Sequence, residues 1–200
     1  MEQEWNFFIS IQELKERGQW PIPWTAAMGL LPEIEKLGTN LVGCEIGVDF
    51  GFNMIYFLEN SNNISKIYAI DPYIPYDDRI TGGQLMTKEE LEKRKNRFLL
   101  NSEPYNDKIT FINKTSNDAV SDIEDNSLDY LFIDGDHNYY AVYQDMKNYY
   151  SKVKSGGIFA GHDLNSRGVQ QAVTQFASEI NLNLNKIMSC RHEVWFWVKD

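Results

Sequence analysis

Basic residues are scarce in this chain of 200 residues. Lysine and arginine number 19 against 29 aspartates and glutamates, which gives a formal net charge of −10 at pH 7. A protein that binds nucleic acid without regard to sequence needs a basic surface to neutralise phosphates, and docking on an anionic membrane needs the same charge. The composition therefore argues against nucleic acid and membrane as partners.

Long apolar runs and cysteines are also few. No apolar run approaches the length of a membrane span, and the N-terminus lacks the basic-then-apolar pattern of a secretion signal. The two cysteines, Cys44 and Cys190, both fall in strand-like apolar runs, where buried reduced thiols are expected rather than a disulfide. These features predict a cytoplasmic protein.

The hydrophobic pattern predicts one α/β domain preceded by a helical N-terminal segment. Hydrophobic residues make up 42% and aromatic residues 14% of the chain, which is enough for a packed core. Strand and helix patterns alternate regularly, which predicts a doubly wound, Rossmann-like, seven-stranded and mostly parallel sheet with a C-terminal antiparallel hairpin. We expect residues 1–40 to form an N-terminal helical cap and residues 41–200 to form the ligand-binding domain.

The individual elements follow from apolar spacing and capping residues. The expected strands lie at about 42–46, 66–70, 108–113, 128–133 and 157–160, with the hairpin at 182–188 and 193–198. Helices are expected at 30–37, 53–60, 87–100, 142–153 and 169–180. The helix at 87–100 begins with a capping box at Thr87 to Glu90 and has Leu91, Phe98 and Leu99 as its apolar contacts. The stretch at 74–83 before it is expected to be a mobile loop near the binding crevice.

The most informative segment is residues 43–53 together with the following apolar run that ends at Asp71. It indicates a buried strand, a glycine turn, the start of a helix and a second buried strand. In a parallel sheet this order builds a nucleotide-sized crevice at the carboxyl ends of the strands. Gly47 and Gly51 let the backbone approach a ligand closely, and Asp71 can accept hydrogen bonds from the hydroxyls of a ribose.

The spacing of this turn disfavours a dinucleotide. Such sites use G-x-G-x-x-G to seat a pyrophosphate, whereas the pattern here is E-x-G-x-x-x-G, with Glu45 and Asp49 beside the turn. Acids repel a pyrophosphate and suit a ligand with a cationic centre, which favours S-adenosylmethionine because it has a sulfonium, an amino group and a ribose but no phosphate. The alternatives are a generic α/β turn without a ligand and a nicotinamide-dependent oxidoreductase, against which the missing third glycine counts.

A second cluster of ionisable residues follows two neighbouring strands. Because the carboxyl ends of parallel strands meet at one edge, these residues should face the same crevice as Gly47 and Asp71. Carboxylates packed so closely repel one another unless they share a cation, such as a divalent metal ion or the sulfonium. The alternative is a turn in which an acid caps the next helix. The cluster comprises Asp134, Asp136, His137, His162 and Asp163.

With these segments in view, the chain resembles the class I S-adenosylmethionine-dependent methyltransferases. The nearer likeness is to the small O-methyltransferase branch that includes catechol and caffeoyl-coenzyme A methyltransferases and related bacterial sugar and macrolide O-methyltransferases. It runs from about Leu41 to Asp200 and is most specific at residues 132–139 and 156–163. The preface, residues 1–40, matches only as a variable cap.

The resemblance implies roles for residues at the cofactor. The methionine half of S-adenosylmethionine would lie against the glycine turn, and Asp71 would hold the ribose. Asp136 would approach the amino group of the cofactor. Ser116, with Thr115 and Asn117 beside it, would lie next to the adenine. The residues implied around the methionine half are Glu45, Gly47, Gly51 and Asn53.

The resemblance also implies a metal and a general base. In metal-dependent relatives, an acid matching Asp134 and an Asp-Asn pair matching His162 and Asp163 bind magnesium. The histidine nitrogen here is softer than oxygen and would shift the preference toward manganese, iron or zinc, unless no metal is held. His137 stands where those relatives have a lysine base, and its ordinary pKa near 6.5 suits proton removal from a hydroxyl.

The expected reaction is methyl transfer from S-adenosylmethionine to a hydroxyl of a small-molecule acceptor such as a sugar, glycan or natural product. The alternative from another class is a catalytically inactive S-adenosylmethionine-binding protein. Aromatic residues at 20–24 and 73–76 either form an acceptor pocket or pack in the core and cap. A homodimer is a plausible assembly.

Overall fold

The computed structural model describes residues 9–23, 25–75, 86–183, 188–190 and 193–200. The predicted loop at 74–83 falls almost wholly outside these ranges. The α-helices are α1 Ile11–Glu16, α2 Ala27–Ile34, α3 Phe52–Asn60, α4 Lys88–Ser102, α5 Ser116–Ala119, α6 Tyr139–Tyr149 and α7 Arg167–Glu179. The 3₁₀ turns are η1 Glu35–Leu37, η3 Glu103–Tyr105, η4 Val120–Asp122 and η5 Tyr150–Lys152. The strands are β1 Leu41–Ile46, β2 Ile64–Ile70, β3 Ile109–Ile112, β4 Leu128–Ile133, β5 Val153–Gly161, β6 Met188–Cys190 and β7 Val194–Val198.

The strands form one seven-stranded sheet in the order β3-β2-β1-β4-β5-β7-β6. The first five strands in this order pair in parallel, whereas β7 is antiparallel to β5 and β6 is antiparallel to β7. The predicted doubly wound, mostly parallel sheet with a C-terminal antiparallel hairpin is therefore confirmed. Because the strand order reverses between β1 and β4, the carboxyl ends of these two strands open a crevice between the helices that follow them.

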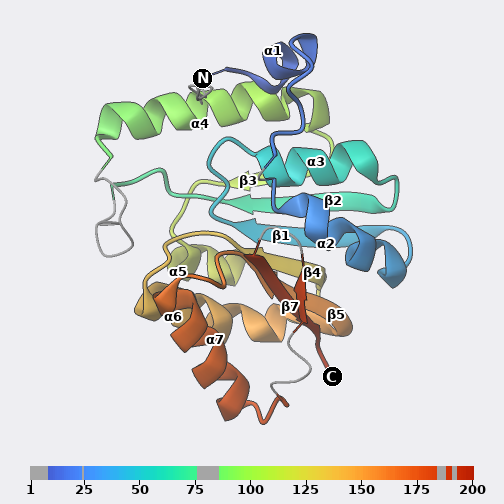
Figure 1. Cartoon of the computed structure of the whole chain (residues 1–200), viewed down its shortest axis with the longest axis vertical. Coiled ribbons are helices and arrows are strands. Elements are labelled where there is room, and N and C mark those ends of the chain that lie inside the picture. Colours follow the sequence, from blue (N-terminus) through green and yellow to red (C-terminus); the bar gives the residue numbers. More distant parts are fainter. Residues whose placement is uncertain (1–8, 24, 76–85, 184–187, 191–192) are drawn as a thin grey trace.

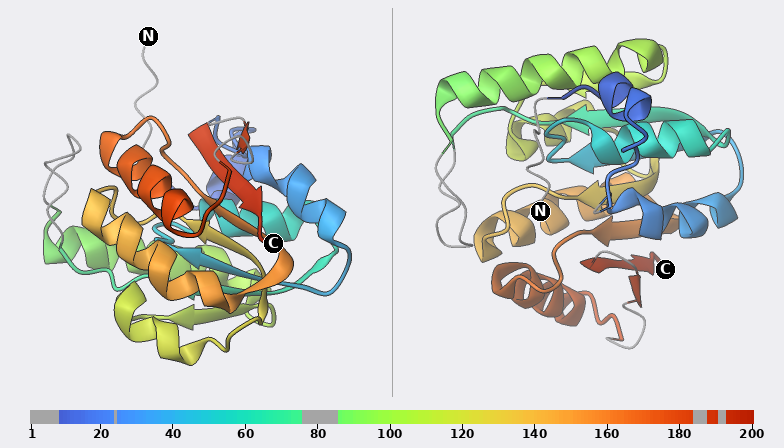
Figure 2. Two further views of the ribbon diagram at one scale, coloured as in Figure 1. Left: turned by 90° about the horizontal axis from the view of Figure 1, so that it is seen from below. Right: turned by 45° about the horizontal axis from the view of Figure 1, so that its top comes forward.

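Helices cover both faces of the sheet, with α2, α3 and α4 on one side and α5, α6 and α7 on the other (Figures 1 and 2). Alternate residues of each central strand serve the two cores because side chains of a strand point to opposite faces. In β4, Tyr130 and Phe132 pack with the α2, α3 and α4 side, and Leu131 and Ile133 pack with the other. All four are at most 4% exposed, as expected for a central parallel strand.

The helix α4 begins where its capping box predicts. Thr87 accepts a hydrogen bond from the backbone of Glu90, whose side chain accepts one from the Thr87 backbone. Leu91 and Phe98 are buried, but Leu99 is 43% exposed, so the prediction of Leu99 as a core contact is wrong. Leu91 and Phe98 are two turns apart on one face, whereas Leu99 lies about 100° further round the helix.

Two predicted boundaries near the end of the chain are also wrong. The crossover helix α6 ends at Tyr149, and Val153 opens β5 instead of closing the helix. The first arm of the hairpin does not begin at Leu182, residues 184–187 of the predicted arm lie outside the described residues, and β6 is Met188–Cys190. Leu182 instead belongs to the turn that caps the C-terminus of α7, because its backbone N–H donates to the Ala177 carbonyl after Asn181 takes a positive φ of 55°.

The N-terminal elements are joined to the rest of the fold by polar side chains. Glu59 of α3 accepts hydrogen bonds from the Trp20 indole at 2.8 Å and the Tyr105 hydroxyl at 2.7 Å, and it pairs with Lys15 of α1. Buried Asn101 of α4 accepts from the Ile11 backbone at 3.0 Å. The described residues around α1 and Trp20 are therefore anchored to α3 and α4. No helix in the described part of the chain has both the length and the apolar character to cross a bilayer.

Candidate active site

A cavity of about 550 Å³ lies at the carboxyl ends of β1, β2, β4 and β5. Its walls come from the turns after these strands, from the segment before α2 and from α4 on one side, and from α5 and α6 on the other. Nine of the predicted site residues line it: Gly47, Asn53, Asp71, Ser116, Asp134, Asp136, His137, His162 and Asp163.

Gly47 is the point where the turn after β1 meets the turn after β4. Its φ is +83°, and a Cβ there would lie 2.2 Å from the Asp134 carbonyl oxygen and 2.5 Å from the Gly135 Cα. Only glycine allows this approach. Gly51 also has a positive φ of 79°, but a Cβ there would point toward Phe98 at 3.0 Å. Gly51 therefore faces the α4 core rather than the cavity.

Asp71, at the end of β2, holds the glycine turn in place. Its Oδ2 accepts hydrogen bonds from the backbone N–H groups of Val48 at 3.0 Å and Asp49 at 3.1 Å, and its Oδ1 accepts one from Tyr73 at 2.8 Å. Burial raises the pKa of Asp71, and these three hydrogen bonds oppose that shift. Each carboxylate oxygen has two acceptor positions, so the group retains capacity for a ligand hydroxyl.

Asp49, the second acid beside the turn, forms an ion pair that the sequence patterns did not indicate. Arg94 of α4 places its Nη1 2.6 Å from Asp49 Oδ1, and its guanidinium lies over the Phe50 ring, 4.8 Å from the centroid. Arg94 also lines the cavity. The segment at 72–107 therefore contributes a cation to the rim of the crevice.

Asn53, in the first turn of α3, joins three separate elements. Its Nδ2 lies 3.3 Å from Glu45 Oε1 in β1 and 3.1 Å from Asp134 Oδ2 after β4, and its Oδ1 accepts from the Ala27 backbone of α2 at 3.1 Å. Glu45 is 2% exposed, and burial together with the nearby Asp134 charge raises its pKa well above the ordinary value. Glu45 lies behind Asn53, and its Oε2 has no protein hydrogen-bond partner.

Thr25, ahead of α2, is a second site residue that sequence reasoning missed. Its side chain is buried, its Oγ1 has no protein hydrogen-bond partner, and the residue lines the cavity. A buried hydroxyl without a partner costs free energy unless a ligand or water completes it. A threonine that follows a proline-containing stretch is not part of any motif, so nothing in the sequence indicates that Thr25 lines a cavity.

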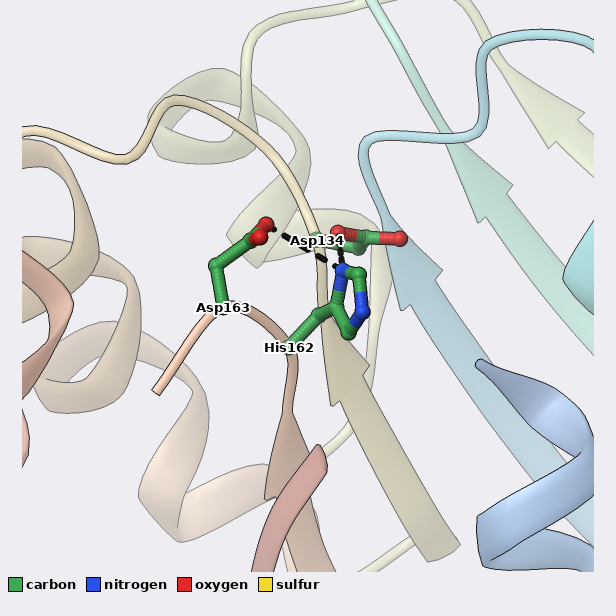
Figure 3. Close-up of side chains that lie close together, drawn as sticks. All are labelled: Asp134, His162 and Asp163. Carbon is green, nitrogen blue, oxygen red and sulfur yellow. Dashed lines mark hydrogen bonds and ion pairs between the residues drawn. The ribbon is translucent and has the colours of Figure 1, made fainter. Parts of the chain in front are cut away.

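The acids and histidines after β4 and β5 are joined in one hydrogen-bonded network. His162 Nδ1 lies 3.1 Å from Asp134 Oδ1 and 3.1 Å from Asp163 Oδ2, and Asp163 Oδ2 lies 2.9 Å from His137 Nε2. Figure 3 shows the His162 ring between the two carboxylates, with Asp163 on the turn that follows β5. Asp163 has a positive φ of 54°, which an aspartate tolerates better than most residues. The predicted convergence of these groups is present.

Within this group of side chains, His162 balances the negative charge of the two carboxylates. Burial lowers the pKa of the imidazole, but its hydrogen bonds and attraction to Asp134 and Asp163 outweigh burial and raise the pKa to about 11. Burial acts in the opposite sense on Asp163, where hydrogen bonds from His137 and His162 hold the pKa well below its usual value. Without a metal, the His162 imidazolium is the cation that the two carboxylates share.

The same three residues fit a divalent cation. One ligand atom from each of Asp134, His162 and Asp163 lies within 4.8 Å of the others. Two carboxylate oxygens and one imidazole nitrogen suit manganese, iron or zinc better than magnesium, which prefers oxygen ligands only. The imidazole must lose its proton to coordinate, so a metal and the His162 proton compete for one position.

Asp136 and Ser116 also line the cavity. Asp136 accepts from the Asn138 backbone at 2.9 Å and bonds the Asn138 side chain, which in turn caps α6 by accepting from Ala141 at 3.1 Å. The capping turn considered as an alternative for this acid is thus present, and Asp136 still lines the cavity. Ser116 opens α5 directly after its N-cap, Thr115.

Three comparisons place this geometry among known proteins. A family profile described as "Methyltransferase domain" matches residues 44–164, which span the glycine turn and the Asp163 turn. Uncharacterized protein y4gI of Sinorhizobium fredii is 27% identical over 68% of this chain and 14% of its own length. Uncharacterized protein R132 of Acanthamoeba polyphaga mimivirus is 29% identical over 70% of this chain and 61% of its own length. The chain thus spans less than two thirds of either relative.

Solved structures share the fold at low sequence identity. The O-methyltransferase NovP superposes with a TM-score of 0.61 at 17% identity, covering 84% of this chain and 78% of that one. Spermidine synthase from Thermotoga maritima superposes with a TM-score of 0.59 at 13% identity, covering 89% of this chain and 60% of that one. An S-adenosylmethionine-dependent O-methyltransferase, also from Thermotoga maritima, reaches 0.51 at 16% identity over 74% of this chain and 47% of that one.

The sheet order defines a Rossmann-like domain with the fold of the O-methyltransferase NovP. The chain belongs to the methyltransferase domain family, whose profile covers more than half of it.

The close approach at Gly47 predicts a matched pair of alanine variants. Gly47→Ala and Gly156→Ala both place a side chain at a φ near +80°, but only Gly47 meets backbone atoms, because nothing lies within 4 Å of Gly156. Both variants should be less stable by about 1–2 kcal/mol, because alanine is strained in the left-handed region. Gly47→Ala should lose at least about 1 kcal/mol more of unfolding free energy, because the turns after β1 and β4 must move apart to admit the methyl group. Urea unfolding of both variants measures the difference, and equal losses would contradict the contact.

The raised pKa of His162 predicts a pH-dependent stability. Since its pKa is about 11 in the folded chain and ordinarily near 6.5, the stabilisation is complete below about pH 6.5 and is lost as the pH rises toward 11. The difference in unfolding free energy between wild type and His162→Gln should therefore shrink between pH 6.5 and pH 10. Urea titrations with a chelator present measure it, and a difference that stays constant over this range would refute the assignment.

Proposed function

We propose that this protein transfers the methyl group of S-adenosylmethionine to a hydroxyl oxygen of a small acceptor. The observation that carries the proposal is the convergence, in one cavity of a methyltransferase-family domain, of the Asp71-braced glycine turn and the Asp163–His137 pair. The first supplies a cofactor site without phosphate contacts, and the second supplies a group that can take a proton.

The cofactor would span the cavity from Asn53 to Ser116. Its methionine end would lie near Gly47 and Asn53, where the Asp134 carboxylate also lines the cavity and favours a cationic sulfur and ammonium. Its ribose would lie against Asp71, whose oxygens already order the turn. Asp136 remains the candidate for the amino group. This arrangement would fix the methyl group beside the histidine cluster, and such alignment contributes several kcal/mol to displacement reactions.

His137 would act as the general base. Its Nε2 lies 2.9 Å from Asp163 Oδ2. A carboxylate beside an imidazole orients the ring and stabilises the imidazolium that forms when a hydroxyl gives up its proton. Asp163 is held in turn by His162, so it stays ionised while His137 changes charge. Asp163 is therefore a positioning residue in this proposal.

Asp134, His162 and Asp163 would hold a divalent metal if one takes part. When bound there, such an ion would act as a Lewis acid that lowers the pKa of the acceptor hydroxyl. The fit of the donor set supports this part of the proposal, and the His162 imidazolium offers the chain a metal-free way to balance the same charges.

The acceptor would enter from the side lined by the segment before α2 and by α4. This part of the cavity is mostly apolar and includes the buried hydroxyl of Thr25, which suits a small molecule with a hydrophobic body and hydroxyl groups. NovP is named as an O-methyltransferase, which supports oxygen as the acceptor atom. The apolar residues concerned are Ile22, Ala26, Phe52, Ile74 and Leu91.

Two substitutions should separate cofactor binding from proton removal. Asp71→Ala should weaken S-adenosylhomocysteine binding by about 10- to 100-fold, because hydrogen bonds to the ribose and the turn are lost. His137→Gln should leave that affinity unchanged and lower turnover by about 100- to 10,000-fold. Calorimetry and transfer of a labelled methyl group to hydroxylated acceptors measure the two effects.

The control for these variants is Asp107→Ala, at an exposed position away from the cavity. It should change neither property. If both site variants keep full turnover on the true acceptor, the assignment fails. If the wild type binds the cofactor but methylates no hydroxyl compound, the protein is a binding protein without this activity.

The metal proposal makes a separate prediction. Mn²⁺ should bind the metal-free protein with one site, more weakly at pH 6 than at pH 8 because it must displace the His162 proton. Asp134→Asn should weaken this binding by about tenfold or more, as loss of a charged ligand does, while Asp136→Asn should not. Electron paramagnetic resonance of free Mn²⁺ measures both. Equal binding by the two variants would exclude this metal site.

A cytoplasmic location and a homodimer remain predictions from the sequence.

A further inference from the structure

The helix α6 presents one face to the cavity. Ala141 and Asp145, one turn apart, both line it, whereas Val142, Met146 and Tyr149 are buried in the core. Asp145 is only 5% exposed. It lay in no motif of the sequence analysis, and the reaction proposed above does not use it. A buried acid at the wall of a ligand cavity therefore needs an explanation.

The surroundings of Asp145 do not stabilise a charge. Burial raises its pKa to about 7, the Ser116 side-chain hydrogen bond opposes this shift, and the Asp136 charge adds to it. Burial raises the pKa of Cys44 in β1 and of Tyr149 in α6, and the nearby Asp145 charge adds to both shifts. Within the described ranges, no lysine, arginine or histidine pairs with Asp145. Burying a carboxyl without a strong donor is costly, and a ligand donor would offset that cost.

We propose that Asp145 recognises the adenine base of the cofactor by accepting a hydrogen bond from its exocyclic amino group. This inference rests on the proposed function and adds a specificity-determining residue to it. Asp145 would be the group that distinguishes adenine from a purine without that amino group.

The position of Asp145 in the cavity supports this assignment. Asp71 ends β2, and Thr115 and Ser116 follow β3, the next strand toward the sheet edge. A base attached to a ribose at Asp71 would extend toward Ser116, with Asp145 beside it on α6. Ala141, one turn before Asp145, lines the same wall with only a methyl group.

The chemistry also matches. Adenine presents an amino donor next to ring nitrogens that accept hydrogen bonds. A carboxyl accepts from the amino group whether or not it is ionised, and when neutral it also donates. An asparagine at this position keeps an acceptor oxygen, whereas a leucine of similar size has none. Leucine would leave the amino group of a bound adenine without its partner, which weakens binding.

The experiment compares two ligands across matched variants by calorimetry. The ligands are S-adenosylhomocysteine and its 6-deamino analogue, in which hydrogen replaces the amino group. Wild type and Asp145→Asn should prefer the adenine ligand by about 10- to 100-fold. Asp145→Leu should bind the two ligands about equally because only the adenine ligand loses affinity. Gln144→Leu, a polar-to-leucine change on the exposed face of α6, should behave as wild type.

Three results would overturn the assignment: no preference in the wild type, a preference retained by Asp145→Leu, or an equal loss of affinity for both ligands. If Asp145→Leu does not fold, Asp145→Ala takes its place with the same expectation. If the wild type binds neither ligand, the proposed function itself fails and this inference fails with it. Binding by the wild type with the wrong pattern removes only the role of Asp145.

Discussion

The site depends on the hydrogen-bonded chain that runs from Asp134 through His162 to Asp163. A parallel sheet brings the ends of its strands to one edge, so acids that follow β4 and β5 must lie together. Unbalanced, they would repel one another and each would bind a proton. His162 lies between them with its Nδ1 3.1 Å from each, and attraction to both carboxylates raises the pKa of its ring, which favours the charged imidazolium. The protein can therefore fold with several acids gathered at one edge of its sheet.

That chain also couples the site to elements far from it in the sequence. The Asn53 side chain donates to Asp134 and accepts from the Ala27 backbone of α2. This one amide group therefore links the N-terminal segment to the acid after β4. Gly47 adds a backbone contact between the ends of β1 and β4. The fold alone does not decide the chemistry of such a crevice, since spermidine synthase has the same architecture. The distinguishing features are the side chains around it.

Local patterns in the sequence predicted much of this structure because they depend on neighbouring residues. The buried strands, the Thr87 capping box and the convergence of Asp134, His162 and Asp163 all follow from periodicity and strand ends. Features that depend on how distant elements pack could not be predicted in this way. Arg94 reaches Asp49 only because α4 docks across the turn, and Asp145 faces the cavity only because of how α6 is rotated. Gly51 was misplaced for the same reason, since Phe98 of α4 packs against it.

The central claim is that an acid-lined crevice without a phosphate cradle receives an adenosyl sulfonium. The most direct measurement is calorimetric titration of the purified, metal-free chain with S-adenosylmethionine, S-adenosylhomocysteine and NAD⁺ under identical conditions. The account predicts that the two adenosyl ligands bind with one site per chain and that NAD⁺ does not bind. Binding of NAD⁺ in preference to both, or no detectable heat with either adenosyl ligand, would contradict it.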